Sequence, residues 1–168
     1  MDLTVRQADL ASAGDSAAIV DVIDSYAGDP AGGGQPLRPD VRARLPGALR
    51  DHPTAVVFLA FVGSEPAGVA VCFLGFSTFH ARPLLNIHDL AVVPERRGQG
   101  IGRALLEAVE AEGVRRGCCR LTLEVQDENR RARRVYDRFG FIDFAVAGSA
   151  TRFLCKPLSQ AIGRTSDE

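Results

Sequence analysis

The sequence has no long apolar run and no marked excess of charge of either sign. A helix that spans a bilayer needs about 20 apolar residues in a row, and no stretch approaches that length. The first residues, MDLTVRQADL, lack the basic and then apolar layout of a secretory signal peptide. The formal net charge of −1 gives no reason to expect nucleic acid or an anionic membrane as a partner. We therefore expect a cytoplasmic protein.

The sequence also lacks cysteines paired for metal binding. Its four cysteines form no CxxC motif and have no histidine partner at zinc spacing, so we expect no metal site. Free cysteine is among the most often buried residue types. We interpret all four as buried thiols of a cytosolic protein, namely Cys72, Cys118, Cys119 and Cys155.

Strand-like and helix-like patterns alternate along what we interpret as one domain, residues 1–158, followed by a polar tail, residues 159–168. Alternating and continuous apolar patterns predict strands over residues 3–8, 54–76 (a hairpin), 84–93, 120–126, 141–146 and 151–158. Helical periodicity predicts one helix that ends near Tyr26, and others over residues 38–50, 101–116 and 128–139. Pro46 should limit the second helix, and the glycine-rich loop at residues 28–36 should be mobile. Together these elements predict an α/β fold with a mixed, mostly antiparallel central sheet flanked by helices.

The stretch PERRGQGIGRALL, residues 94–106, places glycines at 98, 100 and 102 before an apolar helix pattern. The first backbone N–H groups of a helix have no partner inside it, and the helix dipole favours an anion near them. Glycines let phosphate oxygens approach these groups, and Arg97 and Arg103 add charged donors. A turn without a ligand is the alternative. In that case, no bound ligand would offset the conformational entropy that the flexible glycines lose on folding. We therefore favour a phosphate site.

Two common phosphate motifs do not fit this stretch. A Walker A loop needs lysine after its last glycine, whereas Arg103 follows Gly102. A dinucleotide fingerprint, GxGxxG, would start at Gly98 and Gly100, but its third glycine falls on Arg103, where close helix–strand packing needs glycine. Glu124 lies near the distance expected for a ribose-binding acid, which does not outweigh that arginine. A pyrophosphate in another setting is the hypothesis left.

Two motifs carry a resemblance to the GCN5-related N-acetyltransferases (GNAT superfamily), which bind the pyrophosphate of acetyl-coenzyme A. The family's R/Q-x-x-G-x-G/A loop is similar to Arg97-Gly98-Gln99-Gly100-Ile101-Gly102. Its N-x-x-A-x-x-x-Y-x-x-x-G-F spacing is matched by Asn129, Ala132, Tyr136, Gly140 and Phe141. The matching region is the central and C-terminal half of the chain. The N-terminal half, which shapes the acceptor pocket in such enzymes, matches no subfamily pattern.

The resemblance implies the acyl-coenzyme A N-acyltransferase fold, with acetyl-coenzyme A as cosubstrate. The strand before the loop, residues 87–93, and the strand after its helix, residues 121–126, would splay apart. The pantetheine arm would lie in that gap and pair with backbone groups, while the pyrophosphate would lie on the loop. The cofactor-binding residues implied are Leu90, Val92, Arg97, Gly98, Gly100, Gly102, Arg103 and Asn129.

Acetyl transfer from a thioester to an amine needs a neutral amine, a stabilised oxyanion and a proton for the departing thiolate. A backbone N–H such as that of Leu90 is expected to meet the oxyanion. The resemblance implies that Tyr136 is the general acid for the thiolate. On periodicity alone, Tyr136 belongs to an apolar helix stripe with Ala132, Val135 and Phe139, so a core role is the alternative. Both roles can hold at once, because a buried tyrosine also needs a partner for its hydroxyl.

His88 is our candidate for the base that accepts the amine proton. It precedes Leu90 by two residues on one strand, so both side chains are expected on one face. The position resembles one that holds glutamate in polyamine-type members of the family, and histidine accepts a proton near neutral pH. A structural, hydrogen-bonded histidine is the alternative. Asp89, which should face away from His88, or Glu124 could instead act through water.

These inferences predict a single-domain N-acetyltransferase in which a primary amine attacks acetyl-coenzyme A directly, without a metal or a covalent enzyme intermediate. The expected acceptor is a small molecule, and a protein N-terminus or lysine is the alternative. A non-catalytic acyl-coenzyme A-binding module is the competing class, against which Tyr136 and the intact loop argue. The family often dimerises through its late strands, and residues 141–158 do not decide between a monomer and a homodimer.

Overall fold

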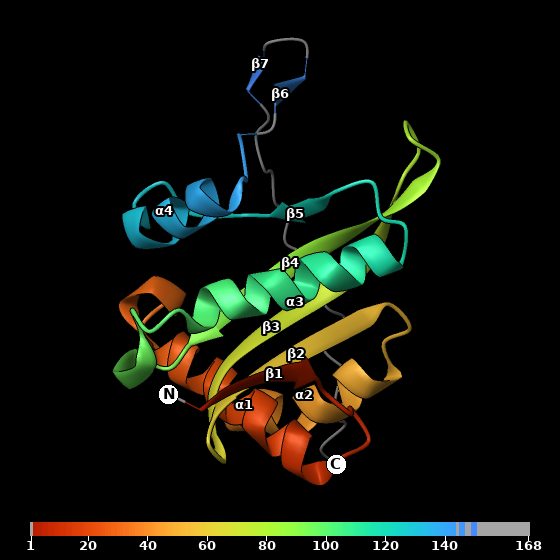
Figure 1. Cartoon of the computed structure of the whole chain (residues 1–168). Helices are drawn as coiled ribbons and strands as arrows, with labels where there is room; N and C mark the ends of the chain where they lie inside the picture. The colour runs from red at the N-terminus through yellow and green to blue at the C-terminus, as the bar shows by residue number, and fades with distance from the viewer. Residues whose placement is uncertain (1, 144, 147–148, 151–168) are drawn as a thin grey trace, which may run out of the picture.

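The computed structural model of the chain describes residues 2–143, 145–146 and 149–150. A five-stranded sheet forms its centre, with the strands in the order β1–β2–β3–β4–β5. Neighbouring strands are antiparallel, except β4 and β5, which are parallel (Figure 1). The strands are β1 (Leu3–Gln7), β2 (Ala55–Val62), β3 (Glu65–Ser77), β4 (Arg82–Val92) and β5 (Leu121–Leu123). The predicted mixed, mostly antiparallel sheet is confirmed.

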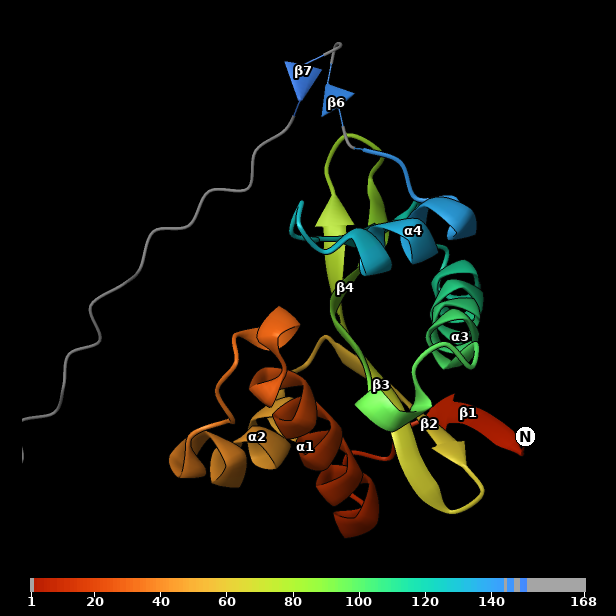
Figure 2. The same ribbon diagram turned by 90° about the vertical axis from the view of Figure 1, so that its left-hand side faces the viewer.

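Helices cover both faces of the sheet (Figure 2). One face carries α1 (Ala13–Gly28) and α2 (Pro39–Asp51), and the other carries α3 (Ile101–Arg115) and α4 (Arg130–Phe139). Two short 3₁₀ turns, η1 (Pro30–Gly32) and η2 (Pro94–Arg96), follow α1 and β4. Within the part of the chain that the structure describes, no helix combines the length and apolarity needed to cross a membrane.

Pro46 does not limit α2, which was expected to be shortened by it. The helix runs through Pro46 to Asp51. Proline removes one hydrogen bond from a helix interior. Here Leu45 and Leu49, on either side of it, pack against the core below α1, and that packing holds the helix together.

Two cores hold the helices to the sheet, one on each face. Toward α3, Phe58 packs with Leu105, while toward α1, Leu59 packs with Ile19. Phe58 and Leu59 are neighbours on β2, and successive residues of a strand point to opposite faces. The run AVVFLAFV is continuously apolar because both faces of β2 are covered by helices.

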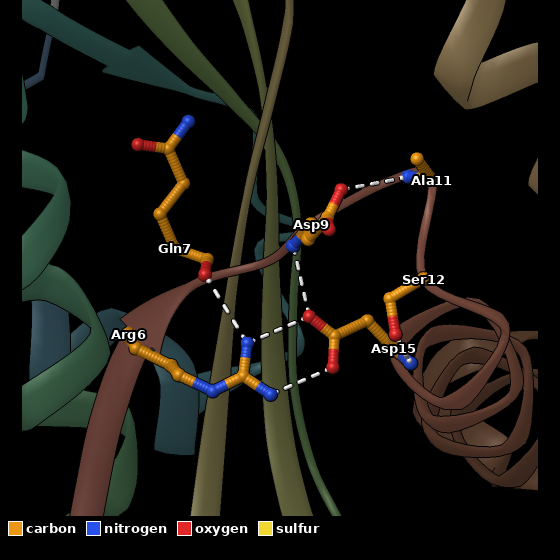
Figure 3. A network of polar contacts seen from close by, with 6 residues as sticks. All are labelled: Arg6, Gln7, Asp9, Ala11, Ser12 and Asp15. Atoms are coloured by element: carbon orange, nitrogen blue, oxygen red, sulfur yellow. Dashed lines mark hydrogen bonds and ion pairs between the residues drawn. The ribbon is translucent and has the colours of Figure 1, made fainter.

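A polar network centred on Asp15 joins β1 to the start of α1 (Figure 3). Both terminal nitrogens of Arg6 donate to the Asp15 carboxylate at 2.6 Å, and the Asp9 N–H donates to it at 2.8 Å. The Ser12 hydroxyl caps the helix by accepting the Asp15 N–H at 3.3 Å. The Asp15 side chain is only 8% exposed. Its donors, Arg6 first, hold the pKa of its carboxyl below the ordinary value.

The C-terminal part differs most from the prediction. β5 does not extend over all of residues 120–126, because the chain leaves β4 after Leu123 and the next residues are exposed. In the stretch expected as a strand at 141–146, the structure describes β6 (Ala145–Val146), which pairs with β7 (Ser149–Ala150) in a separate two-stranded sheet. The strand expected at 151–158 and the tail expected at 159–168 lie outside the described residues.

Candidate active site

A cavity of about 370 Å³ lies between β4, the start of α3, α4 and the end of α1. Its lining includes every residue that was expected to bind the cofactor, together with Tyr136. The cofactor residues are Leu90, Val92, Arg97, Gly98, Gly100, Gly102, Arg103 and Asn129. The fold therefore brings the two sequence motifs to one hollow.

β4 borders this cavity with a main-chain edge that no described strand covers. β5 pairs with β4 only at residues 85–87, so the two strands separate beyond that point. The Val93 N–H donates to the Ala67 carbonyl of β3 at 3.0 Å. Because successive residues of a strand direct their main-chain groups to alternate edges, those of Val92 and Leu90 point away from β3, into the gap. An extended ligand can pair there as an additional strand.

The loop before α3 has a conformation that glycine permits. Gly98 and Gly100 have φ values of 80° and 84°, in the left-handed region that other residues rarely adopt. Gly100 is the N-cap of α3 and offers no side chain to the first N–H groups of the helix, which can therefore bind a ligand. Gly102 differs, because a Cβ there would meet Val92 Cγ2 at 3.8 Å, an ordinary contact. Glycine at 102 leaves room in the cavity and relieves no backbone strain.

Arginine dominates the charged part of the lining. The arginines come from η2, the loop after it, the first turn of α3 and α4, and they are Arg96, Arg97, Arg103, Arg131 and Arg138. Arg97 binds Asp29 at 2.7 Å, and Arg103 binds Glu107 at 2.9 Å. An adjoining hollow of about 330 Å³ against α4 is lined by Arg131, Arg134, Val135 and Arg138. Asp29 and Glu107 thus neutralise only part of the positive charge of these five arginines. The guanidinium groups therefore suit a ligand with several negative charges, such as a pyrophosphate.

Asn129 and Gly140 define the helix that carries Tyr136. The Asn129 Oδ1 caps α4 by accepting the Ala132 N–H at 3.1 Å. Gly140 ends the helix in the left-handed conformation, with φ of 99°. Two motif positions thus have local structural roles, and Asn129 also lines the cavity.

Tyr136 belongs both to the core and to the cavity. Its ring is partly buried against the core next to α3 and meets the Phe141 ring edge-on, with centroids 5.7 Å apart. Burial raises the pKa of its phenol to about 12, and the neighbouring Tyr26 contributes to the rise. The phenol therefore carries its proton throughout the neutral range, as a general acid must.

β4 contains a β-bulge at His88. Val71 of β3 pairs with Asp89, while the next residue, Cys72, pairs with Ile87. One residue of β4, His88, is therefore left without a partner on β3. The bulge lies where β5 separates from β4, so the sheet opens and changes register at the same place.

The expectation that His88 and Leu90 share one face is wrong, because the bulge interrupts the alternation. Leu90 packs toward the core next to α3. The exposed His88 ring meets Phe73, which belongs to the opposite core, with centroids 5.7 Å apart. His88 is absent from the described lining of the cavity. Its role as the base stays a prediction that no contact here supports.

The two carboxylates considered as alternative bases differ in burial. Burial raises the pKa of the Asp89 carboxyl, an effect that a charged His88 would offset in part. Glu124 is exposed, just past the end of β5. Neither residue is among the described lining, so each would need water to reach an amine.

Tyr26, which was not predicted as a site residue, lines the cavity from the last turn of α1. Burial first, and then the charges of Asp89 and Asp29, raises the pKa of its phenol. Arg96 and Arg138, which belong to the arginine-rich stretches of the sequence, also line the cavity but were not predicted as site residues. The only signal for Tyr26 was an aromatic residue immediately before a glycine-rich loop, because nothing in the spacing connects residue 26 with residue 136.

A family model described as "Acetyltransferase (GNAT) family" matches residues 19–141 of the chain. The match begins within α1, continues past the end of α4 and includes all of the cavity residues. The chain belongs to this family, and the resemblance drawn from two motifs is confirmed. The cosubstrate of the family, acetyl-coenzyme A, agrees with the predicted cofactor.

Curated relatives act on several amines, according to their names. The thialysine N-epsilon-acetyltransferase of Caenorhabditis elegans is 30% identical over 111 residues, which cover 66% of this chain and 68% of that protein. The streptothricin acetyltransferase of Streptomyces lavendulae is 34% identical over 95 residues, which cover 56% of this chain and 49% of that protein. The chain thus matches between about half and two thirds of the length of these relatives.

Solved acetyltransferases share the fold. An aminoglycoside acetyltransferase, meta-AAC0020, from an uncultured soil metagenomic sample aligns with a TM-score of 0.75 and 17% identity, over 94% of this chain and 97% of that one. AAC(6')-Iy, in complex with the bisubstrate analog CoA-S-monomethyl-acetylneamine, aligns with a TM-score of 0.73 and 15% identity, over 95% and 100%. The predicted acyl-coenzyme A N-acyltransferase fold is therefore confirmed.

Proposed function

We propose that this protein transfers the acetyl group of acetyl-coenzyme A to the primary amine of a small molecule, by direct attack of the amine. One observation carries the proposal: a single cavity connects the glycine–arginine loop at the start of α3 with the Tyr136 phenol. A phosphate site alone would need the loop and not the phenol. The two together fit a ligand that has a pyrophosphate at one end and a reactive thioester at the other.

The described residues fit acetyl-coenzyme A along the cavity. The N–H groups at the start of α3, with Arg96 and Arg131, would hold the pyrophosphate. The main-chain edge at Leu90 and Val92, where the Val92 carbonyl also accepts from Arg97 Nε at 3.1 Å, would hold the pantetheine arm. When bound there, the cosubstrate supplies an acetyl thioester.

Within this site, two groups of the chain have chemical roles. The Leu90 N–H, which points away from β3, would donate to the oxygen that becomes negatively charged when the amine attacks. The Tyr136 phenol would give its proton to the departing sulfur. For the amine proton we propose water as the first acceptor, since neither His88, Asp89 nor Glu124 lines the cavity.

Direct attack is supported by the absence of a usable nucleophile. Among the described residues that line the cavity there is neither cysteine nor serine. Cys72 lies in the core, where burial raises the pKa of its thiol to about 12, so it is a poor source of thiolate. Free thiols at Cys72, Cys118 and Cys119 also fit the cytoplasm, the compartment that we propose.

The names of the relatives support a small amine as the acceptor. Thialysine and streptothricin, named for two of them, are small molecules. A protein N-terminus or lysine is the alternative acceptor for this chain. The homodimer expected from the family stays a prediction.

Release of coenzyme A thiol in the presence of acetyl-coenzyme A and single amines tests this function. The panel holds thialysine, a polyamine, an aminoglycoside and a peptide with free N-terminal and lysine amines. We expect thiol release with at least one small amine and none without an amine. Release with the peptide alone would replace the small-molecule acceptor by a protein. Binding of acetyl-coenzyme A without release from any amine would favour a non-catalytic module.

A further inference from the structure

Arg97, the first residue of the glycine loop motif, is already engaged on both sides by the protein. Its Nη1 donates to Asp29 Oδ2 at 2.7 Å, and its Nε donates to the Val92 carbonyl at 3.1 Å. The side chains of Arg97 and Asp29 are 24% and 17% exposed. The ion pair of Arg103 with Glu107 joins neighbouring turns of α3, and its side chains are 76% and 55% exposed, as is usual for a surface pair. The Arg97 pair is therefore a partly buried contact between two segments that are distant in the sequence.

Asp29 organises the end of α1 and the loop after it. Its N–H donates to the Tyr26 carbonyl at 3.0 Å, which ends the helix. Its carbonyl accepts from the Gly32 and Gly34 N–H groups at 2.8 and 2.9 Å. The loop that was expected to be mobile is thus folded around the residue that binds Arg97.

The chain of contacts leads from the cofactor loop to Tyr26. Figure 1 shows the end of α1 next to the loop that precedes α3. Tyr26 lines the same cavity as Tyr136 but comes from the opposite layer of helices. It is the only lining residue contributed by the N-terminal half of the described chain. Asp29 is joined directly to this part of the wall, because its N–H donates to the Tyr26 carbonyl.

We propose that Asp29 and Arg97 are positioning residues for the acceptor side of the site. Their ion pair holds Tyr26 and the loop at residues 28–36 against the loop at residues 97–102, so that Tyr26 forms a fixed wall opposite Tyr136. In this arrangement the main task of Arg97 is to join the two halves of the site, and the pyrophosphate is held by the helix N–H groups and the other arginines. The inference rests on the proposed function for its kinetic part, and on the geometry alone for the position of Tyr26.

Asp29→Asn removes the charge that Arg97 binds, and Glu107→Gln is the matched control, because it frees Arg103, another arginine that lines the cavity. We expect Asp29→Asn to raise the KM for the amine about tenfold, as a displaced positioning group does. The Kd for acetyl-coenzyme A should stay within about twofold, or fall, since Arg97 is then free to meet a phosphate. Glu107→Gln should leave the amine KM unchanged. Arg97→Gln breaks the same pair from the other side and should raise the amine KM as well.

Tyrosine fluorescence gives a readout that needs no activity. The chain has two tyrosines and no tryptophan, so Tyr26 is the only emitter in a Tyr136→Phe background. In that background, Asp29→Asn and Arg97→Gln should increase quenching of Tyr26 by acrylamide, at least about twofold, whereas Glu107→Gln should not.

Two results would overturn the inference. One is equal quenching of Tyr26 in Asp29→Asn and Glu107→Gln. The other is a rise only in the Kd for acetyl-coenzyme A, which would make Arg97 a cofactor ligand and the ion pair a passive contact. If the unsubstituted protein acetylates no amine, the proposed function fails, and the quenching comparison still decides whether the pair positions Tyr26.

Discussion

Tyr136 lines the cavity and carries a protonated phenol, as the proposed general acid for the thiolate must. Burial keeps its phenol protonated, with a pKa of about 12, and its ring lines the cavity from α4. Tyr136→Phe removes the hydroxyl and keeps the ring that packs on Phe141. We expect kcat to fall about 100-fold while the Kd for acetyl-coenzyme A changes little. Steady-state kinetics with an accepted amine, together with acetyl-coenzyme A binding, measure both quantities.

An unchanged kcat in Tyr136→Phe would exclude Tyr136 as the general acid.

His88→Gln tests the separate question of which group accepts the amine proton. A pH profile of His88→Gln that loses its acidic limb would restore His88 as the base, whatever its position in the free protein.

At the scale of single residues, the motif positions were predictable and the others were not. The glycine loop, Asn129 and Tyr136 have fixed spacings, and all of them line the cavity. His88 was placed by strict alternation along a strand, which a bulge breaks without leaving a mark in its own sequence. Tyr26 was missed because no spacing in the sequence brings the end of α1 to the loop before α3, where Arg97 meets Asp29 across 68 residues.

At the scale of elements, the contact between β1 and α1 depends on the buried carboxylate of Asp15. Asp15→Asn keeps the shape and removes the charge that Arg6 binds, and at pH 7 it should lower the free energy of unfolding by about 1–2 kcal/mol. The folded pKa of Asp15 lies below its unfolded value. The stabilisation is therefore complete above the unfolded pKa and is lost as the pH falls through the folded pKa.

Urea unfolding of both proteins at neutral and at strongly acidic pH measures this difference. The control is Asp51→Asn, because the Arg50–Asp51 pair is 56% and 70% exposed and should contribute little. A loss that is the same at both pH values would show that the charge of Asp15 has no part in stability.

Elements with a strong apolar pattern were predicted well, and weakly patterned ones were not. The β2–β3 hairpin is apolar on both faces and was identified with its turn. β5 was expected to be longer, because LTLEVQ alternates through residue 126. Its pairing ends at Leu123, where β4 bulges and separates, and a partner strand decides where a strand stops.

At the scale of the whole molecule, the site exists only because two layers of helices meet across an opened sheet. α3 and α4 supply the loop and Tyr136 from one face, and α1 supplies Tyr26 from the other (Figure 2). The order of elements predicted the sheet and its helices. It could not predict that the end of α1 reaches the cofactor loop, since that depends on side-chain contacts between distant segments.

Thermal unfolding with and without acetyl-coenzyme A tests the central claim, that this cavity binds that cosubstrate. At about a hundred times its Kd, a ligand that binds only the folded state adds about 2.7 kcal/mol of stability. We predict a clear rise in Tm with acetyl-coenzyme A and none with NAD or ATP at the same concentration. A rise with NAD instead, or no rise with any of the three, would contradict the account.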